Sequence, residues 1–373
     1  MSSLSALRYL NDNGNWERTI SPAKDDDREW ANIEIQRQKW KEFLSQPDCS
    51  LDNIEIWQYF KDENRPSPVG KAFLGIFSNK IKIQKNVKKL IRGGVPPELR
   101  ARVWWVCSGA AEKMNRSTAT QQYGFLVQQI DELDASIKKE IEKDINRTFP
   151  GRIDSGSSSK ENSLDSNDIN NTRLLLPMTK VLSAYALRNP SVGYCQSMNF
   201  ICALLLFHLS EEESFWVLAA LIEDILPPDY YSPSMIGCRV DHQAFQSCIA
   251  WKLSKVHAHL VYTKTLLDPI CCGWFLCGFL NTISLYSCCR VWDCLFHEGN
   301  IVLFRVAIAM MKTKELELCE ATDFVSIYEV LKSTSPDKPS YTLEPSPDPS
   351  MSAVSYLLDV GININLYNKL FIN

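Results

Sequence analysis

Residues 189–200, NPSVGYCQSMNF, bring a phenol, a thiol and an amide together at Tyr194, Cys195 and Gln196, after a turn and ahead of a long apolar run. A thiol beside a histidine can act as a nucleophile, but no partner histidine is marked in the sequence and the flanking residues match no protease signature. A glutamine does no acid–base chemistry, although its amide can donate and accept hydrogen bonds at once. The segment alone leaves the use of Gln196 open.

A second polar group lies at the end of an expected helix, in the segment IEKDINRTFP. Ile141, Asp144 and Arg147 follow one another at intervals of three, which puts the acid near the helix end and the arginine just past it. Asp144 is then within reach of Arg147 and can orient its guanidinium. On the residues alone, we prefer a helix-terminal ion pair without a functional role.

The cysteines suggest a metal site less than they suggest a core. The sequence has 13 of them, and its N-terminus does not resemble a secretory signal, so we expect reduced thiols. Six cysteines and one histidine make a doubled pattern that suggests a structural zinc site, but there is no C-x-x-C pair and they alternate with Trp, Phe and Leu. We therefore prefer core packing for this set, which comprises Cys271, Cys272, Cys277, Cys288, Cys289, Cys294 and His297.

Several function classes lack their motifs. The sequence has no phosphate-binding glycine loop, no H-E-x-x-H and no G-x-S-x-G, and its five histidines have no ligand spacing, so no cofactor site of its own is expected. The net charge of −4 argues against a general nucleic-acid or anionic-membrane binder. The apolar windows are too short or too interrupted to span a bilayer, so we predict a soluble intracellular protein.

The N-terminal part is expected to be a polar, flexible leader over 1–28 and a helical extension over 29–89. Ile33, Arg37, Trp40 and Leu44 recur at helical spacing in that extension. Basic residues gather over 80–92, where we prefer a solvated helix face to a membrane-surface helix.

Helical patterns dominate the rest of the chain. Prolines after GGV predict a helix start, followed by an apolar stripe from Leu99 to Ala110 that is typical of a core helix. Isoleucine and leucine spacing predicts one helix over 129–145, and the run at 198–209 is apolar almost all round, which indicates a buried helix. Ser210 and Glu213 form an expected capping box for the next helix, which must stop at Pro227–Pro228.

Three stretches are expected to lie outside the helical core. Residues 151–171 are rich in Ser, Asn and Asp, which predicts a disordered surface insertion. Residues 334–350 predict a Pro/Ser-rich linker, and residues 351–373 form a C-terminal segment. No hairpin signal and no fixed repeat is visible, so the predicted fold class is all-α.

Three segments together resemble the signature motifs of the TBC domain, the catalytic domain of GTPase-activating proteins for Rab small GTPases. GGVPPELRARVWW is similar to the Arg-x-x-x-Trp motif, IEKDINRTFP to Ile-x-x-Asp-x-x-Arg, and NPSVGYCQSMNF to Tyr-x-Gln. They occur in the family's order, and later blocks such as CCRVWDCLFHEG also resemble it. The resemblance covers roughly residues 90–333. The matched positions are Arg100 and Trp104, then Ile141, Asp144 and Arg147, then Tyr194, Cys195 and Gln196.

The resemblance implies a multi-helical architecture of two packed subdomains over 90–333, with the extra N-terminal helices outside it. It also implies a catalytic role for Arg147, which would enter the phosphate site of the GTPase, and for Gln196, which would position the attacking water. Asp144 would orient Arg147, and Tyr194 would pack or bond beside the glutamine's backbone. Arg100 and Trp104, one turn apart on one face, are expected to stack and to be structural.

The resemblance further implies a GTP-bound Rab as partner, acted on in trans in vesicle trafficking. GTP and Mg²⁺ would be carried by that partner, with no nucleotide hydrolysis by this chain itself. We expect no nucleic-acid partner, a cytoplasmic location and at most peripheral association with endomembranes. Ser197 departs from the Gly or Ala of many relatives. The alternative is a TBC-like scaffold that binds a GTPase or effector without accelerating hydrolysis.

Overall fold

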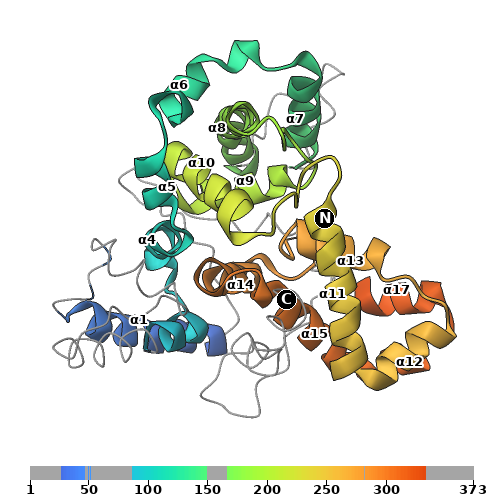
Figure 1. The fold of residues 1–373 in the computed structure, drawn as a ribbon. Helices are drawn as coiled ribbons and strands as arrows, with labels where there is room; N and C mark the ends of the chain where they lie inside the picture. Colours follow the sequence, from blue (N-terminus) through green and yellow to red (C-terminus); the bar gives the residue numbers. More distant parts are fainter. Residues whose placement is uncertain are drawn as a thin grey trace, which may run out of the picture.

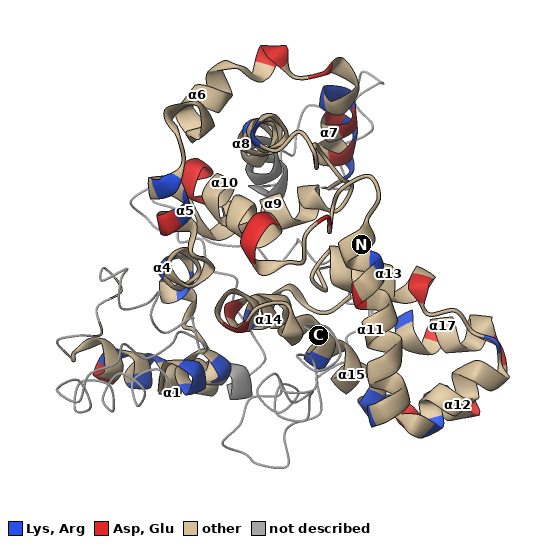
Figure 2. Ribbon diagram, viewed as in Figure 1, with Lys and Arg blue, Asp and Glu red and all other residues tan. Residues whose placement is uncertain are grey.

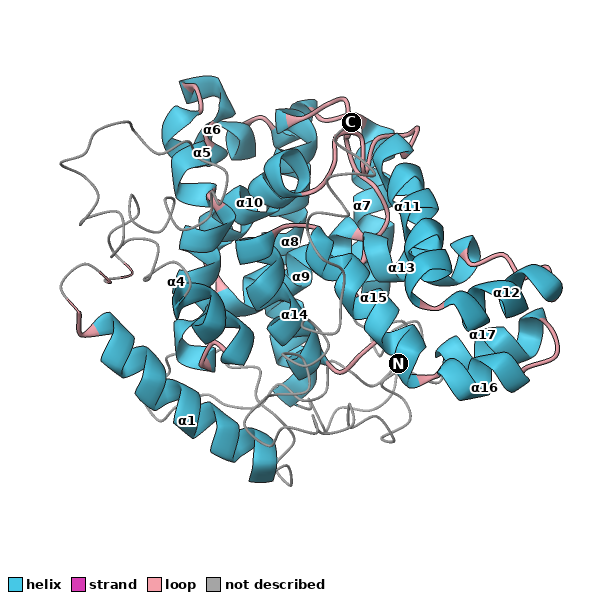
Figure 3. Cartoon of the chain, turned by 60° about the horizontal axis from the view of Figure 1, so that its bottom comes forward, coloured by secondary structure: helices cyan, strands magenta, loops and turns pink. Residues whose placement is uncertain are grey.

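The computed structural model describes residues 27–46, 49, 51, 86–148, 166–280 and 282–332, and over these residues it contains helices and loops but no strand (Figure 3). The all-α prediction is confirmed. The α-helices are α1 (Asp27–Leu44), α4 (Pro97–Ser108), α5 (Ala110–Arg116), α6 (Tyr123–Gln128), α7 (Ala135–Thr148), α8 (Ser166–Arg188), α9 (Met198–His208), α10 (Glu211–Ala220), α11 (Ile236–Lys252), α12 (Ser254–Tyr262), α13 (Asp268–Leu276), α14 (Leu285–Glu298), α15 (Ile301–Thr313), α16 (Glu315–Glu320) and α17 (Phe324–Lys332). A further helix without a label covers residues 86–93. The shorter elements are the 3₁₀ turns η2 (Ala119–Gln121) and η3 (Ile130–Glu132) and the π-helical turn η4 (Leu221–Ile225).

The helices form two packed groups, as predicted (Figure 1). In the first, α8 is surrounded by α6, α7, α9 and α10. In the second, α11, α13 and α15 pack together, with α12, α16 and α17 at the far end. The contact of α4 with α14 joins the two groups. The functional segments identified from the sequence lie mainly in the first group.

The helix boundaries around α9 and α10 follow their capping residues. Ile201 to Leu206 on α9 are all almost fully buried, which confirms the predicted buried helix. The Ser210 hydroxyl accepts a hydrogen bond from the Glu213 amide, and the Glu213 carboxylate accepts one from the Ser210 amide at 2.9 Å. This is the predicted capping box. The chain then passes through η4 and leaves the helical conformation before Pro227.

Helix α4 is the predicted core helix, with Pro97 in its first turn, where a missing N–H costs no hydrogen bond. Val103, Val106 and Cys107 are buried. The helix ends at Gly109, whose φ of 83° is in the left-handed region that glycine adopts without strain. The apolar stripe therefore continues into a separate helix, α5, from Ala110 onward.

The single helix predicted over 129–145 is wrong in its first part. The structure has the 3₁₀ turn η3 there, an extended Leu133, and then α7 from Ala135. The cause is Asp134, whose carboxylate accepts a hydrogen bond from the Ser136 amide at 2.8 Å and so starts a new helix. The apolar spacing continued across this break and concealed it.

Helix α8 begins earlier than the sequence predicted. It starts at Ser166, so residues 166–171 of the predicted disordered insertion are helical, while 151–165 lie outside the described residues. Once a helix is nucleated, each added residue gains a backbone hydrogen bond at little further cost, so a polar start can join an apolar helix.

The N-terminal extension packs on the start of the main helical body. The Trp40 indole donates to the Gly94 carbonyl at 2.7 Å, and Arg37 donates to Glu98 at 2.7 Å. Helix α1 starts at Asp27, so the last part of the predicted 1–28 leader is helical. The remaining leader, most of the 29–89 extension after α1, the 334–350 linker and the 351–373 segment lie outside the described residues.

The cysteine cluster is part of the core, as we preferred. Cys271, Cys277, Cys288, Cys289 and Cys294 are buried, and Cys289 Sγ lies 3.5 Å from His208 Nε2. Over the described ranges, no group of three or more His, Cys, Asp or Glu side chains could hold a metal ion. Within the same described ranges, no helix has the length and apolar character needed to cross a bilayer.

Candidate functional site

The last turn of α7 carries a charged pair with one buried and one exposed member. The Asp144 carboxylate is buried, whereas the Arg147 side chain is 40% exposed, and the two are joined at 2.7 Å between Nη2 and Oδ1. Arg147 lies inside α7, which ends at Thr148, and not just past the helix as the sequence suggested. A buried carboxylate thus holds an arginine whose outer donors face solvent.

Tyr194 ties this pair to the loop that carries Gln196. Its hydroxyl donates to Asp144 Oδ2 at 2.8 Å, so the two oxygens of Asp144 bind residues from two segments distant in the sequence. Burial, and then the hydrogen bond to Asp144, raise the pKa of Tyr194 well above its usual value, so the phenol stays protonated and keeps donating. The sequence had placed Tyr194 beside the glutamine's backbone, and the structure gives it Asp144 as partner.

The loop after α8 is shaped by its own backbone. The amides of Val192 and Gly193 both donate to the Asn189 carbonyl, and Gly193 has a φ of 60°. At the other end of the loop, Ser197 has a φ of 106°, a conformation that favours glycine. Gln196, between them, is exposed, and its amide makes no hydrogen bond to any part of the chain that the structure describes.

Cys195 is a poor candidate for a nucleophile. Burial, together with the nearby Cys272 and Cys277 thiols, raises the pKa of Cys195 to about 11. A thiol with that pKa stays protonated near neutral pH, and the thiolate is the reactive form. Its amide donates to the Met198 sulfur at 3.2 Å, which helps to fix the loop.

Asn199, at the start of α9, connects the loop with the end of α7. Its side chain is fully buried, and its Nδ2 donates to Thr148 Oγ1 at 2.7 Å and to the Asp144 carbonyl at 3.4 Å. Its Oδ1 accepts from the Ser197 amide at 3.1 Å. The sequence assigned Asn199 no role, and the signal that could have found it is a polar side chain at the start of an otherwise apolar helix.

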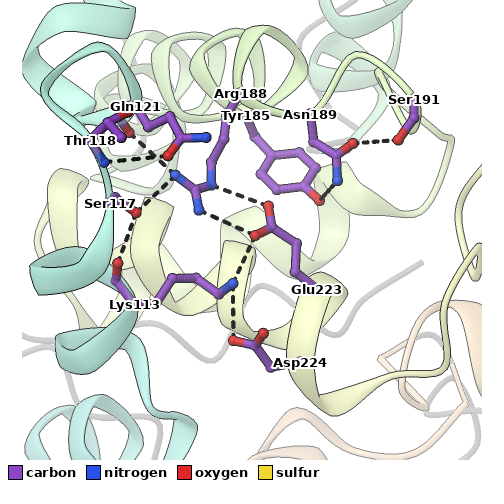
Figure 4. A network of polar contacts seen from close by, with 10 residues as sticks. All are labelled: Lys113, Ser117, Thr118, Gln121, Tyr185, Arg188, Asn189, Ser191, Glu223 and Asp224. Carbon is purple, nitrogen blue, oxygen red and sulfur yellow. Dashed lines mark hydrogen bonds and ion pairs between the residues drawn. The ribbon is translucent and has the colours of Figure 1, made fainter.

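Arg188 anchors the end of α8 just before the loop (Figure 4). Its guanidinium points to the Glu223 carboxylate, with bonds of 3.2 and 3.3 Å, and also donates to the Ser117 hydroxyl at 3.2 Å. Lys113 reaches the same carboxylate from the other side at 2.8 Å. Glu223 lies in η4, and π-helical turns occur frequently at functional sites.

The first signature motif is far more buried than the other two. Arg100 and Trp104 are fully buried, and both donate to Asp293 Oδ1 on α14, at 2.9 and 2.7 Å. Asp293 is thus the shared acceptor of these two buried side chains. They join the two helical groups, because α4 packs against α10 of the first group and α14 against α15 of the second.

The polar surface around this site carries no single sign. Figure 2 shows acidic and basic residues alternating along α7, whereas α9 carries neither. Arg147 is therefore one positive group among mixed charges, and its position is set by Asp144 and not by a basic patch.

The family model for the Rab-GTPase-TBC domain matches residues 97–319. This chain belongs to the Rab-GTPase-TBC domain family. The matched range contains the motif residues of all three signature segments, from Arg100 to Gln196. Membership in this family implies a Rab GTPase as partner.

Two relatives support this assignment at the level of sequence and fold. The chain is 36% identical over 261 residues to growth hormone-regulated TBC protein 1 of Homo sapiens, covering 70% of this chain and 72% of that protein. The fold is similar to the crystal structure of the Chlamydomonas flagellar RabGAP TBC domain, with a TM-score of 0.60 over 92% of this chain and 97% of that one. The two sequences are 26% identical.

A more distant structure shows the fold alone. The crystal structure of the Ypt/Rab-GAP domain of Gyp1p superposes with a TM-score of 0.61 over 91% of this chain and 99% of that one, at 14% identity. The all-α arrangement of two helical groups is thus retained where little of the sequence is.

Proposed function

We propose that this chain accelerates GTP hydrolysis by a Rab small GTPase, and that it supplies Arg147 and Gln196 in trans to the GTPase's nucleotide site. One observation carries the proposal most: the buried Asp144 binds the exposed Arg147 with one oxygen and Tyr194 with the other. Tyr194 precedes the exposed Gln196 in the same short loop. The segments that carry the two exposed side chains are therefore joined directly.

Arg147 is suited to stabilise charge on a transferred phosphoryl group. A guanidinium presents five donors in a planar fork, so it can contact β- and γ-phosphate oxygens together. Asp144 engages Nη2, and the side chain's exposure leaves further donors for a ligand. A salt bridge to a buried carboxylate also restricts the side chain, which lowers the cost of ordering it in a complex.

Gln196 is suited to hold the attacking water. Its amide can accept a hydrogen bond from a water molecule and donate one elsewhere without any change of protonation. Small GTPases hydrolyse GTP slowly, because the developing charge and the water are poorly held, and an arginine supplied in trans accelerates such reactions by about 10³–10⁵-fold. In this proposal GTP and Mg²⁺ stay with the GTPase, and the chain hydrolyses no nucleotide by itself.

The proposal extends to the cell. We place the protein in the cytoplasm, with at most peripheral association with endomembranes, where a GTP-bound Rab would be its substrate in vesicle trafficking. The family membership supports the Rab partner, and the net charge of −4 offers no reason to expect tight binding to anionic lipid.

Single-turnover GTP hydrolysis by a panel of Rab proteins tests the proposal. We expect the wild-type chain to accelerate at least one Rab, and Arg147→Ala and Gln196→Ala each to lower that acceleration by about 10²-fold or more. Lys143→Ala is a matched control, because Lys143 is an exposed cation one turn before Arg147 on α7. Full acceleration by both the Arg147 and the Gln196 variants would contradict the mechanism, and binding to GTP-loaded Rab without any acceleration would indicate a scaffold.

A further inference from the structure

One buried amide lies between the two segments that carry Arg147 and Gln196. Asn199 donates to the hydroxyl of Thr148, the residue after Arg147, and accepts from the amide of Ser197, the residue after Gln196. These bonds measure 2.7 and 3.1 Å, and Asn199 is 0% exposed. No other described side chain contacts the immediate neighbours of both residues through hydrogen bonds.

The bonding around this amide allows one arrangement. Thr148 Oγ1 donates to the Asp144 carbonyl at 2.7 Å and accepts from Asn199, so its hydrogen is committed. Asn199 uses both the oxygen and the nitrogen of its amide. If the amide were rotated by 180°, its nitrogen would face the Ser197 N–H and its oxygen would face Thr148 Oγ1, whose hydrogen is already donated to Asp144. Because these groups are buried, an unmade bond would cost the desolvation of its partner.

The same amide supports an unfavourable backbone conformation. Ser197 has a φ of 106°, which costs free energy for any residue but glycine, and Asn199 binds its amide directly. Residues held in such conformations persist where the surrounding structure determines them. Asn199 is thus placed to fix the direction in which the chain leaves Gln196.

We propose that Asn199 and Thr148 form a positioning pair that sets the backbone at Arg147 relative to the backbone at Gln196. The inference rests on the proposed function, since it gives the pair a purpose only if both side chains act on one GTPase. Neither residue touches the reacting groups. Their effect is on geometry, and misplacing a catalytic group by about 1 Å can cost about 10²-fold in rate.

Thr148→Val is the sharpest variant, because it keeps the shape of the side chain and replaces only the hydroxyl, with a methyl group that cannot form hydrogen bonds. Thr148→Ser restores that hydroxyl. Thr179→Val is the matched control, since the Thr179 hydroxyl donates to the Leu175 carbonyl four residues earlier, as Thr148 does to Asp144, and has no asparagine partner. Each variant is measured with a responsive Rab in single turnover, which separates the maximal rate from the half-saturating concentration.

We expect Thr148→Val to lower the maximal rate by about 10–100-fold with a half-saturating concentration within about twofold of wild type. Thr148→Ser should recover most of the rate, and Thr179→Val should keep it. In a Gln196→Ala background, Thr148→Val should lower the maximal rate much less than in wild type, because the side chain that Thr148 helps to position is already absent. If the pair had only a structural role, Thr148→Val would change the free energy of unfolding and the half-saturating concentration, and its effect would not depend on Gln196.

Hydrogen exchange tests the pair without any GTPase. We expect faster exchange of the Ser197 amide in Thr148→Val than in wild type or Thr179→Val, because Asn199 loses its hydroxyl partner. Unchanged exchange would overturn the structural part of the inference. Faster exchange together with a wild-type maximal rate, while Arg147→Ala and Gln196→Ala are inactive, would overturn its catalytic part and leave the proposed function standing.

Discussion

The arginines of two signature motifs form ion pairs with aspartates that differ in almost every physical respect. Arg100 and Asp293 are both 0% exposed and lie at the junction of α4 and α14. Arg147 is 40% exposed and pairs with the buried Asp144 inside one helix. A motif arginine is therefore not evidence of a catalytic role by itself, because the same residue type serves the core in one motif and faces solvent in another.

The energetics of the two pairs follow from this burial. Removing one partner of a buried ion pair leaves an uncompensated charge in a medium of low polarity, which is strongly destabilising. Removing the half-exposed Arg147 should cost less, because the buried Asp144 carboxylate that remains keeps the hydrogen bond from Tyr194. Burial raises the cost of losing Asp293, and exposure leaves Arg147 free to bind a ligand.

The largest expected effect on stability comes from Asp293→Ala. This change leaves the Arg100 guanidinium and the Trp104 indole without their shared acceptor, so the free energy of unfolding should fall by about 3–5 kcal/mol. Arg147→Ala should lower it by only about 1–2 kcal/mol, because the buried Asp144 loses its cation but keeps the hydrogen bond from Tyr194. Urea denaturation of both variants measures the contrast, and equal losses would remove the distinction drawn between the two pairs.

A third buried carboxyl, that of Asp241, accepts a hydrogen bond from the neutral amide of Asn300, whereas that of Asp293 is paired with the Arg100 cation. The difference shows what burial does to a carboxyl that has a neutral donor. Burial raises the pKa of Asp241 to about 7 from its ordinary 3.8. The folded state then binds more protons than the unfolded state between about pH 4 and 7, so stability should decline as pH rises through that range. At about 1.36 kcal/mol per pKa unit, the whole effect is at most about 4 kcal/mol.

Asp241→Asn should remove this part of the pH dependence and stabilise the protein above pH 7. Thermal unfolding of the wild type and the variant from pH 5 to 8 measures it. Parallel pH profiles for the two proteins would show that Asp241 does not titrate in this way.

The smallest effect concerns the loop beside Gln196. Ser197→Gly should raise the free energy of unfolding by up to about 1 kcal/mol, because glycine adopts a φ of 106° without strain. Part of this gain is offset, because glycine also increases the conformational entropy of the unfolded chain. Thermal unfolding checks this, with Ser191→Gly in the same loop as control. A loss of stability in Ser197→Gly would mean that the serine side chain contributes more than the strain costs.

The sequence predicted the fold class well because helical periodicity and capping residues are local signals. The capping box at Ser210 and the buried α9 are two examples. It failed at Asp134, where one polar side chain starts a new helix within a continuous apolar pattern. The apolar spacing is compatible with a helix that starts at Gln129 and with one that starts at Ala135, and local patterns alone do not distinguish the two.

The site was predictable only in part. The resemblance pointed to Arg147 and Gln196, and local spacing gave the contact between Asp144 and Arg147. The partners Asp293 and Glu223 were missed, because each acts on a residue far away in the chain. The best available signal was an acidic residue directly between apolar ones in an expected helix, such as Asp293 between Trp292 and Cys294.

The most direct test of the proposed mechanism compares binding to two states of one Rab. An activator that completes the nucleotide site should bind Rab loaded with GDP and aluminium fluoride, an analogue of the transition state, at least about 10²-fold more tightly than Rab loaded with a non-hydrolysable GTP analogue. Arg147→Ala should abolish this preference and keep the weaker affinity. Equal affinity of the wild-type chain for both states would contradict the account and favour a scaffold.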